Sequence, residues 1–222
     1  VESVFFRWGA VHDHVDLLDA ARAADVPHYA VSEQNLITVS DTVTPQGVVA
    51  VCRTVDVALA EALADDPQLV VICAQIRDPG NAGTVIRCAD AFGADAVILS
   101  SDSVEVYNPK TVRASVGSIF HLPLVEGVDL AEAIDACRAA GLQVFATDGE
   151  SGTELTDLTD RLAQPTAWVM GNESWGLPTE HLQLADTTVA VPIYGAAESL
   201  NLATAAAVCL YASASAQHTA SD

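Results

Sequence analysis

The sequence predicts an α/β protein in which a domain with a mostly parallel β-sheet and helices on both faces follows a small α/β domain. After residue 68, short apolar runs alternate with stretches of helical periodicity, as in sheets built from strand–helix–strand units. Three turns that combine glycine with polar residues follow such runs, and open parallel sheets bind ligands at the carboxyl ends of their strands. Half of the 222 residues are apolar, so a sizeable core is possible and disorder is disfavoured.

The first domain is expected to span residues 1–62 and to alternate strands and helices. The patterns that indicate this are VESVFF (1–6), HDHVDLLDAARAADV (12–26), HYAVS (28–32) and GVVAVC (47–52), with a turn-rich segment DTVTPQG at 41–47. His12 and His14 lie beside aspartates at the expected helix start, which is more typical of a solvated helix face than of a metal site.

The second domain is expected to span residues 63–222, because EALADDPQ (61–68) reads as a helix end and a linker with Pro67 as the stop. Its expected strands are 69–74, 94–100, 119–125, 142–147, 167–171 and 187–192. Its expected helices are 82–92, 108–115, 130–140, 178–184 and 199–216.

The charge is strongly acidic and unevenly spread. Nine basic and 30 acidic residues give a formal charge of −21, which argues against a non-specific nucleic-acid binder. Residues 75–120, however, contain four basic and five acidic residues, which leaves −20 for the rest of the chain. This near-neutral window is either a surface that faces phosphate or an accident of composition.

The remaining composition suggests a cytoplasmic protein without a membrane span or a metal. The five cysteines include no CxxC pair and are interpreted as buried apolar side chains in a reducing compartment: Cys52, Cys73, Cys88, Cys137 and Cys209. The apolar segment 199–216 is rich in alanine and includes Asn201 and Thr204, so it is expected to be a buried helix. No signal peptide is recognised, and since the chain begins at Val1 its natural N-terminus is expected to be missing.

The first polar turn lies in QIRDPGNAGTVIRCADAFGADAVIL, residues 75–99. Asn81 stands near the expected helix start, where it could be an N-cap or part of an anion site. Arg87 lies off the apolar stripe of that helix, so it could form a surface ion pair or have a function. The turn lacks GxGxxG, which disfavours a dinucleotide cofactor.

Two further turns follow later strands. In WVMGNESWGLP (168–178), Glu173 lies between two glycine turns and could cap a helix, face solvent or serve a site. In VPIYGAAESLNLATAAAVCLY (191–211), Ser199 is the expected N-cap of the last helix. Asn201 enters that apolar helix and needs a hydrogen-bond partner, because an unsatisfied buried amide costs on the order of 1–3 kcal/mol.

Taken together, the three turns resemble the motifs of the SpoU (TrmH-like) family of RNA 2′-O-ribose methyltransferases in the SPOUT superfamily, over residues 70–211. The motif N…R.A.AFG is matched by Asn81, Arg87, Ala89, Ala91, Phe92 and Gly93. The motif G.E..GL is matched by Gly171, Glu173, Gly176 and Leu177, and P..G...SLN by Pro192, Gly195, Ser199, Leu200 and Asn201. More weakly, the first domain resembles a partial ribosomal-protein-L30e-like RNA-binding domain.

The resemblance implies a C-terminal trefoil knot, a rare exception to unknotted topology, and a homodimer formed with help from the last helix. It implies S-adenosyl-L-methionine as the cofactor and transfer of its methyl group to a ribose 2′-hydroxyl of RNA. The implied cofactor-binding residues are Thr147, Gly171, Asn172, Gly176, Ile193 and Leu202. The implied catalytic residues are Arg87, Asn81, Glu173, Ser199 and Asn201.

Within the family, the arginine of the first motif is associated with deprotonation of the ribose hydroxyl. A guanidinium group stays protonated in proteins, so we favour a role for Arg87 in binding RNA phosphate and stabilising the developing alkoxide. Glu173, Ser199 and Asn201 would orient Arg87 and the ribose. No metal is implied.

Several alternatives stay open at this point. The L30e-like segment favours rRNA over tRNA, and an enzyme that protects rRNA from an antibiotic is also compatible with the sequence. A knotted RNA-binding or assembly protein without activity and an unrelated α/β nucleotide-binding enzyme are the competing classes. The acidity has three explanations: basic residues in a missing N-terminus, an acid-rich proteome, or RNA contact confined to residues 75–120.

Overall fold

The computed structural model describes residues 1–40 and 45–220, and its contacts divide the chain into two compact units, Val1–Thr54 and Val55–Asp222. Residues 41–44 of the expected turn at 41–47 lie outside the described residues. The expected boundary at residues 62 and 63 stays a prediction. Ala62 and Leu63 pack in a core cluster of the second unit.

The first unit has a three-stranded sheet in the order β2-β1-β3, with β1 parallel to β2 and antiparallel to β3. Its elements are β1 (Ser3–Arg7), η1 (Val11–His14), α1 (Val15–Ala23), β2 (His28–Val31), α2 (Glu33–Ser40) and β3 (Val48–Val51). Val4 and Phe6 of β1 pack against Ala21 of α1. The helix α2 was not predicted, because Leu36 is its one buried residue and its sequence therefore shows no apolar stripe.

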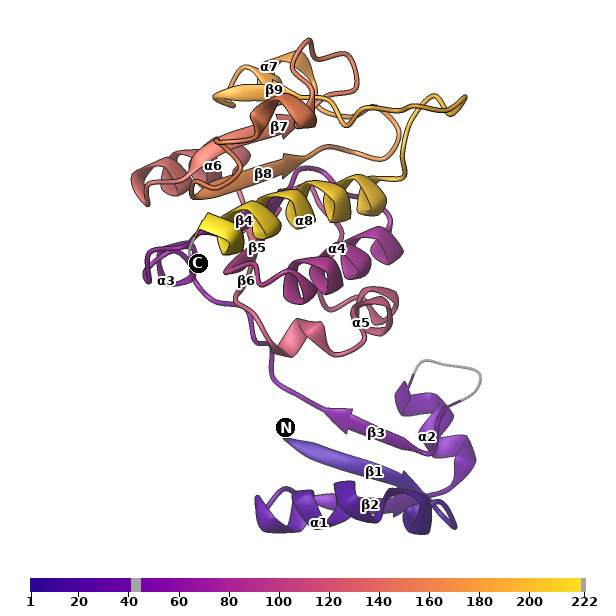
Figure 1. The fold of residues 1–222 in the computed structure, drawn as a ribbon. Helices are drawn as coiled ribbons and strands as arrows, with labels where there is room; N and C mark the ends of the chain where they lie inside the picture. Colours follow the sequence, from indigo (N-terminus) through magenta and orange to yellow (C-terminus); the bar gives the residue numbers. More distant parts are fainter. Residues whose placement is uncertain (41–44, 221–222) are drawn as a thin grey trace. The chain divides into compact units, whose positions relative to one another are not determined.

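The second unit has a six-stranded, entirely parallel sheet in the order β6-β5-β4-β8-β7-β9 (Figure 1). Its strands are β4 (Leu69–Cys73), β5 (Ala96–Ser100), β6 (Leu124–Val128), β7 (Gln143–Thr147), β8 (Thr166–Met170) and β9 (Thr187–Val189). Its helical segments are α3 (Leu59–Ala62), α4 (Pro79–Ala91), α5 (Pro109–Ser115), η2 (Ser118–Phe120), α6 (Leu130–Ala139), η3 (Leu155–Leu158), α7 (Thr179–Leu182) and α8 (Leu202–Ala220). The predicted parallel sheet is confirmed.

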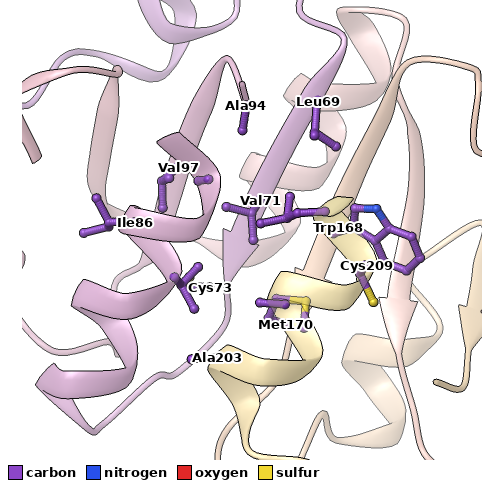
Figure 2. Packing of buried hydrophobic residues seen from close by; sticks show 14 of the residues in the cluster. Leu69, Val71, Cys73, Ile86, Ala94, Val97, Trp168, Met170, Ala203 and Cys209 are labelled. Carbon is purple, nitrogen blue, oxygen red and sulfur yellow. The ribbon is translucent and has the colours of Figure 1, made fainter. Parts of the chain in front are cut away.

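Apolar side chains fill both faces of this sheet. Val71 of β4 packs on one face in a cluster with Ile86 of α4 and Cys209 of α8 (Figure 2). Ile72 points the opposite way and packs in a second cluster with Ile134 of α6. Strands buried on both sides read as continuous apolar runs rather than as alternating patterns, which is why β4, β5 and β8 were recognisable in the sequence.

The last helix is fixed to the middle of the sheet through a buried polar contact. The indole Nε1 of Trp168 in β8 donates a hydrogen bond to Ser213 Oγ of α8 at 2.9 Å, and both residues are fully buried. A buried indole N–H needs such a partner, so this bond satisfies the largest side chain of the core. It also fixes the position of α8, whose N-terminus lies at the functional site.

Three predicted elements of the second unit begin three or more residues from the expected position. The helix expected at 82–92 begins at Pro79. The strand expected at 119–125 is wrong at its start, because Ile119 belongs to η2, and β6 begins at Leu124. Val116 and Gly117 both have positive φ angles, so the chain turns sharply where an extended run was expected. The last helix begins at Leu202 rather than at residue 199 and extends to Ala220.

The interpretation of all cysteines as buried is wrong for Cys52, which is exposed, and Cys88 is only partly buried. Burial raises the pKa of each of the thiols of Cys73, Cys137 and Cys209 to about 12. These three side chains therefore act as small apolar groups in the core. Within residues 1–40 and 45–220, no helix has both the length and the apolarity that a membrane span requires.

The helices α4 and α5 pack so closely that a side chain at Gly83 has no room. A Cβ atom there would lie 2.4 Å from the Thr111 carbonyl oxygen and 2.6 Å from Ala114 Cβ. We expect Gly83→Ala to lower the free energy of unfolding by about 1–3 kcal/mol, since the clash outweighs the gain in helix propensity. Thermal denaturation would measure this, with Gly152→Ala as the control because a Cβ at Gly152 meets no atom within 4 Å. A rise in melting temperature for Gly83→Ala would contradict the packing.

Candidate active site

A cavity of about 570 Å³ opens at the carboxyl ends of β7, β8 and β9. Its walls come from three stretches: residues 147–154, 170–176 and 189–205. All six residues expected to bind a cofactor line it, namely Thr147, Gly171, Asn172, Gly176, Ile193 and Leu202. The volume falls within the range of about 300–1,000 Å³ that is typical of sites for small ligands and cofactors.

The carboxylate of Glu173 joins the loop after β8 to the start of α4. It accepts hydrogen bonds from the backbone N–H groups of Arg77 at 3.2 Å and Asp78 at 3.1 Å, and from Asn81 Nδ2 at 3.2 Å. Backbone N–H groups at a helix start attract anions, so this position suits a carboxylate. Two of the expected catalytic residues, Glu173 and Asn81, are thus in direct contact.

Asn81 is not the N-cap of α4, as one interpretation of the sequence held. Asp78 is the N-cap, since its Oδ1 accepts a hydrogen bond from the backbone N–H of Asn81 at 2.8 Å and Pro79 occupies the first helical position. The side chain of Asn81 is therefore available to the site. The sequence Asp-Pro at a helix start is a recognised cap pattern and could have located the cap.

Asn201 has two tasks. Its Oδ1 accepts hydrogen bonds from the backbone N–H groups of Ala203 at 2.9 Å and Thr204 at 3.2 Å, which makes it the N-cap of α8 in place of Ser199. Its Nδ2 donates to Asn81 Oδ1 at 3.0 Å. The polar chain Glu173–Asn81–Asn201 therefore links the first turns of α4 and α8 to the loop after β8, and Asn201 has the partners that the sequence required.

The loop 171–177 is held rigidly beside the cavity. Asn172 and Gly176 exchange two backbone hydrogen bonds of 2.9 Å, and Asn172 Nδ2 donates to the Gln75 carbonyl oxygen at 2.7 Å. Gly171 has to be glycine, because a Cβ atom would lie 2.5 Å from the carbonyl carbon of Gly176. Gln75 has φ +56°, an uncommon value for a residue with a side chain, at the point where β4 enters the site.

An ion pair flanks the start of α4. Lys110 Nζ of α5 lies 3.0 Å from Asp78 Oδ2. The hydrogen bond from Asn81 N–H, followed by the hydrogen bond from Lys110, lowers the pKa of the Asp78 carboxyl. Neither Asp78 nor Lys110 was among the expected site residues.

The other two expected catalytic residues lie apart from this network. Ser199 is exposed and lines the cavity. Arg87 is exposed on α4 and forms no hydrogen bond or ion pair with any residue in the described part of the chain, so its expected surface ion pair is absent. The geometry thus brings together Asn81, Glu173 and Asn201 directly and places Ser199 on the cavity wall.

Three acidic residues that no sequence pattern singled out also line the cavity: Asp148, Glu154 and Glu198. Asp148 and Glu154 lie in a loop outside the matched motifs, and Glu198 occupies an unspecified position of the third motif, so only the folded arrangement identifies them. Among residues 1–40 and 45–220, no three histidine, cysteine or acidic side chains gather as metal ligands.

Comparison with known proteins agrees with this geometry. The model of the SpoU rRNA Methylase family matches residues 68–211, and that of the RNA 2′-O ribose methyltransferase substrate-binding domain matches residues 1–57. The 23S rRNA (guanosine(2553)-2′-O)-methyltransferase RlmP of Bacillus subtilis is 38% identical over 183 residues, covering 82% of this chain and 71% of that protein. The 23S rRNA (uridine(2479)-2′-O)-methyltransferase of Streptomyces viridochromogenes is 39% identical over 168 residues, covering 70% of this chain and 58% of that protein.

A solved structure of the SpoU methyltransferase AviRb from Streptomyces viridochromogenes, in complex with the cofactor AdoMet, has a TM-score of 0.85 and 32% identity. The alignment covers 99% of this chain and 84% of AviRb. The two family models, these relatives and the cofactor-bound structure identify an S-adenosylmethionine-dependent RNA 2′-O-ribose methyltransferase. The chain belongs to the SpoU rRNA methylase family.

The two tasks of Asn201 can be separated by substitution. Asn201→Asp keeps an oxygen that caps α8 but removes the amide that donates to Asn81. Because Asp and Asn are equivalent caps, we expect the melting temperature to change little while methyl transfer falls at least about tenfold. Asn201→Ala removes both contacts and should also lower stability by about 1 kcal/mol. Full activity of Asn201→Asp in a methyl-transfer assay would show that the bond to Asn81 has no functional role.

Proposed function

We propose that this chain methylates a ribose 2′-hydroxyl of large-subunit ribosomal RNA, at a site formed by Asn81, Glu173, Ser199, Asn201 and Arg87. The observation that carries the proposal is the chain of hydrogen bonds from Glu173 through Asn81 to Asn201, at the edge of a cavity in a SpoU-family fold. The two relatives described above act on 23S rRNA according to their names, and residues 1–57 match a substrate-binding model.

The cavity fits S-adenosyl-L-methionine. Gly171 and Gly176 expose backbone at its wall, where adenine can be recognised through N–H and C=O groups, while Ile193 and Leu202 supply apolar surface. When bound, the cofactor supplies a methyl group activated by its sulfonium. The task of the protein is then to align the ribose oxygen with that group and to exclude water, which is the usual contribution of such sites.

Arg87 serves as the contact to RNA phosphate and as the electrostatic partner of the developing alkoxide. It is an exposed cation, and within the described residues no carboxylate pairs with it. A guanidinium presents a planar set of donors that matches a phosphate and remains charged throughout the reaction. The amides of Asn81 and Asn201 hold the ribose. Glu173 orients Asn81 by accepting a hydrogen bond from its Nδ2, and Asn81 in turn orients Asn201 by accepting a hydrogen bond from Asn201 Nδ2.

The wider assembly is part of the same proposal. The chain works in the cytoplasm as a homodimer, and the exposed Val208 and Tyr211 of α8 supply an apolar surface for the partner. The segment between β9 and α8 threads a trefoil knot. This is supported by the return of the chain from the edge strand β9 to the sheet centre, where α8 packs on α4, β4 and β8. Residues 1–62 form the L30e-like domain and residues 63–222 the methyltransferase domain.

A methyl-transfer assay distinguishes the proposed function from two others. An inactive RNA-binding or assembly protein would keep the fold without transferring methyl groups, and a tRNA-directed enzyme would modify the wrong class of RNA for this proposal. The assay incubates the purified chain and labelled S-adenosylmethionine with unmodified rRNA and, separately, with tRNA. The modified nucleotide is then mapped. We expect a single 2′-O-methyl nucleotide in rRNA, whereas labelling of tRNA alone, or of neither, would refute the proposal.

Substitution of Arg87 tests its role. We expect Arg87→Ala to lower methyl transfer at least about a hundredfold, because both the phosphate contact and the alkoxide stabilisation are lost. Its affinity for S-adenosylmethionine, measured by titration calorimetry, should stay nearly unchanged. Arg87→Lys keeps the charge without the planar donors, so its rate of methyl transfer should lie between those of Arg87→Ala and the unaltered chain. The methyl-transfer rate of the unaltered chain should decline steeply as the salt concentration is raised, because phosphate contacts release counterions. Near-normal turnover of Arg87→Ala on the mapped rRNA would exclude this role.

A further inference from the structure

The charged residues that line the cavity are all acidic. They are Asp148, Glu154, Glu173 and Glu198, and the lining contains no lysine, arginine or histidine. This composition is not what binding of a neutral or anionic molecule would favour. It gives the cavity four carboxylates on three separate loops, one after β7, one after β8 and one before α8.

Within residues 1–40 and 45–220, no lysine or arginine forms an ion pair with any of these four carboxylates. In the described part of the chain, the ion pairs of lysine and arginine involve Glu2, Asp19, Glu33, Asp78, Asp135 and Asp186. Glu173 accepts its hydrogen bonds from neutral amides, and Asp148 accepts one from the backbone N–H of Glu150 at 3.0 Å. Glu198 has neither a hydrogen bond nor an ion pair within those residues. The cavity therefore has an uncompensated negative potential.

The cofactor loses one positive charge during the reaction, and an acidic cavity binds a cation more tightly than a neutral molecule. As the C–S bond breaks and the C–O bond forms, the electron pair of the C–S bond stays on sulfur and the hydroxyl proton passes to solvent. The sulfonium of S-adenosylmethionine becomes the neutral thioether of S-adenosylhomocysteine. The ammonium and the carboxylate of the methionine part are identical in both molecules, so one positive charge is the main difference between cofactor and product.

We propose that the carboxylates of the cavity, with Asp148 and Glu198 as the principal contributors, bind the cationic cofactor more tightly than its neutral product. The inference rests on the proposed function, because it assumes that S-adenosylmethionine occupies this cavity. Its consequence is that methyl transfer itself weakens the binding of the molecule in the cavity. New cofactor then displaces the product more readily.

The size of the effect follows from the exposure of the groups. Glu198 is exposed and Asp148 is partly exposed, so water and salt screen their fields. A carboxylate a few ångströms from a charge in such surroundings changes affinity by roughly fivefold. We therefore expect a preference of about fivefold or more for the cationic ligand at low salt, which falls towards unity in 0.5 M NaCl.

Titration calorimetry with three ligands and no RNA tests the inference without reference to activity. The ligands are S-adenosylmethionine, S-adenosylhomocysteine and sinefungin, in which a carbon that bears a protonated amine replaces the methylsulfonium. We expect sinefungin to bind like the cofactor, and both to bind more tightly than the product. Only the two cationic ligands should lose affinity as NaCl is raised.

Single substitutions identify the source of the preference. Glu198→Gln and Asp148→Asn should each reduce the ratio of cofactor to product affinity by about two- to fivefold, through weaker binding of the cofactor rather than tighter binding of the product. Glu132→Gln is the matched control. It removes the same charge from an exposed position on α6, outside the cavity, and should leave the ratio unchanged.

Each other result has a distinct meaning. Equal affinities for cofactor and product in the unaltered chain would overturn the inference but leave the cofactor site intact. An unchanged ratio of cofactor to product affinity in Glu198→Gln and Asp148→Asn would also overturn it. This includes the case in which both variants lose affinity for cofactor and product equally, because these residues would then act through shape rather than charge. Failure of all three ligands to bind would refute the proposed function, and the inference with it.

Discussion

The arrangement of the site depends on one carboxylate placed at the start of a helix. Glu173 accepts two backbone hydrogen bonds and one side-chain hydrogen bond from residues 77–81, nearly a hundred positions earlier in the chain. Because the free N–H groups of a helix start favour an anion, this contact fixes the loop after β8 against α4. Asn81 is oriented by it, and Asn201 is oriented in turn through Asn81. Three segments that no short-range pattern connects are therefore held by a single series of polar contacts, and the cavity lies beside them.

The sheet was predictable from the sequence because its physics is local. A strand such as Leu69–Cys73, in which every residue is buried, is written as an unbroken apolar run between turn formers. Prediction failed where a β-branched residue adopts a left-handed conformation, as Val116 does with φ +51°, or where only Leu36 of a helix is buried. The site was only partly predictable. The resemblance to a family supplied Asn81, Glu173 and Asn201, but the residue types alone fitted helix caps equally well.

Helix caps explain why a sequence cannot separate structure from function at this site. Asn201 is both the cap of α8 and the donor to Asn81, and each task uses a different atom of the same amide. Asn81 looks like a cap, yet Asp78 three residues earlier takes that place and leaves the amide of Asn81 to bind Glu173 and Asn201. The residue types alone do not show which side chain caps a helix and which one serves the site. The hydrogen-bond partner of each side-chain atom depends on the position of a loop that is distant in the chain.

The two charge patterns of the chain belong together. Among the described residues, the side chains of Arg77, Arg87 and Arg113 take part in no ion pair, and all three lie in the near-neutral window of residues 75–120. The cavity, by contrast, is lined by carboxylates alone among charged groups. A polyanion and a cationic cofactor require opposite potentials, and a chain with nine basic residues has few cations to distribute. Under the proposed function, the unpaired arginines near α4 and α5 contact the RNA phosphates, and the acidic cavity favours the cationic cofactor. The net charge of −21 is then compatible with an RNA enzyme, because the distribution of charge around the site, and not its sum, determines which ligand binds where.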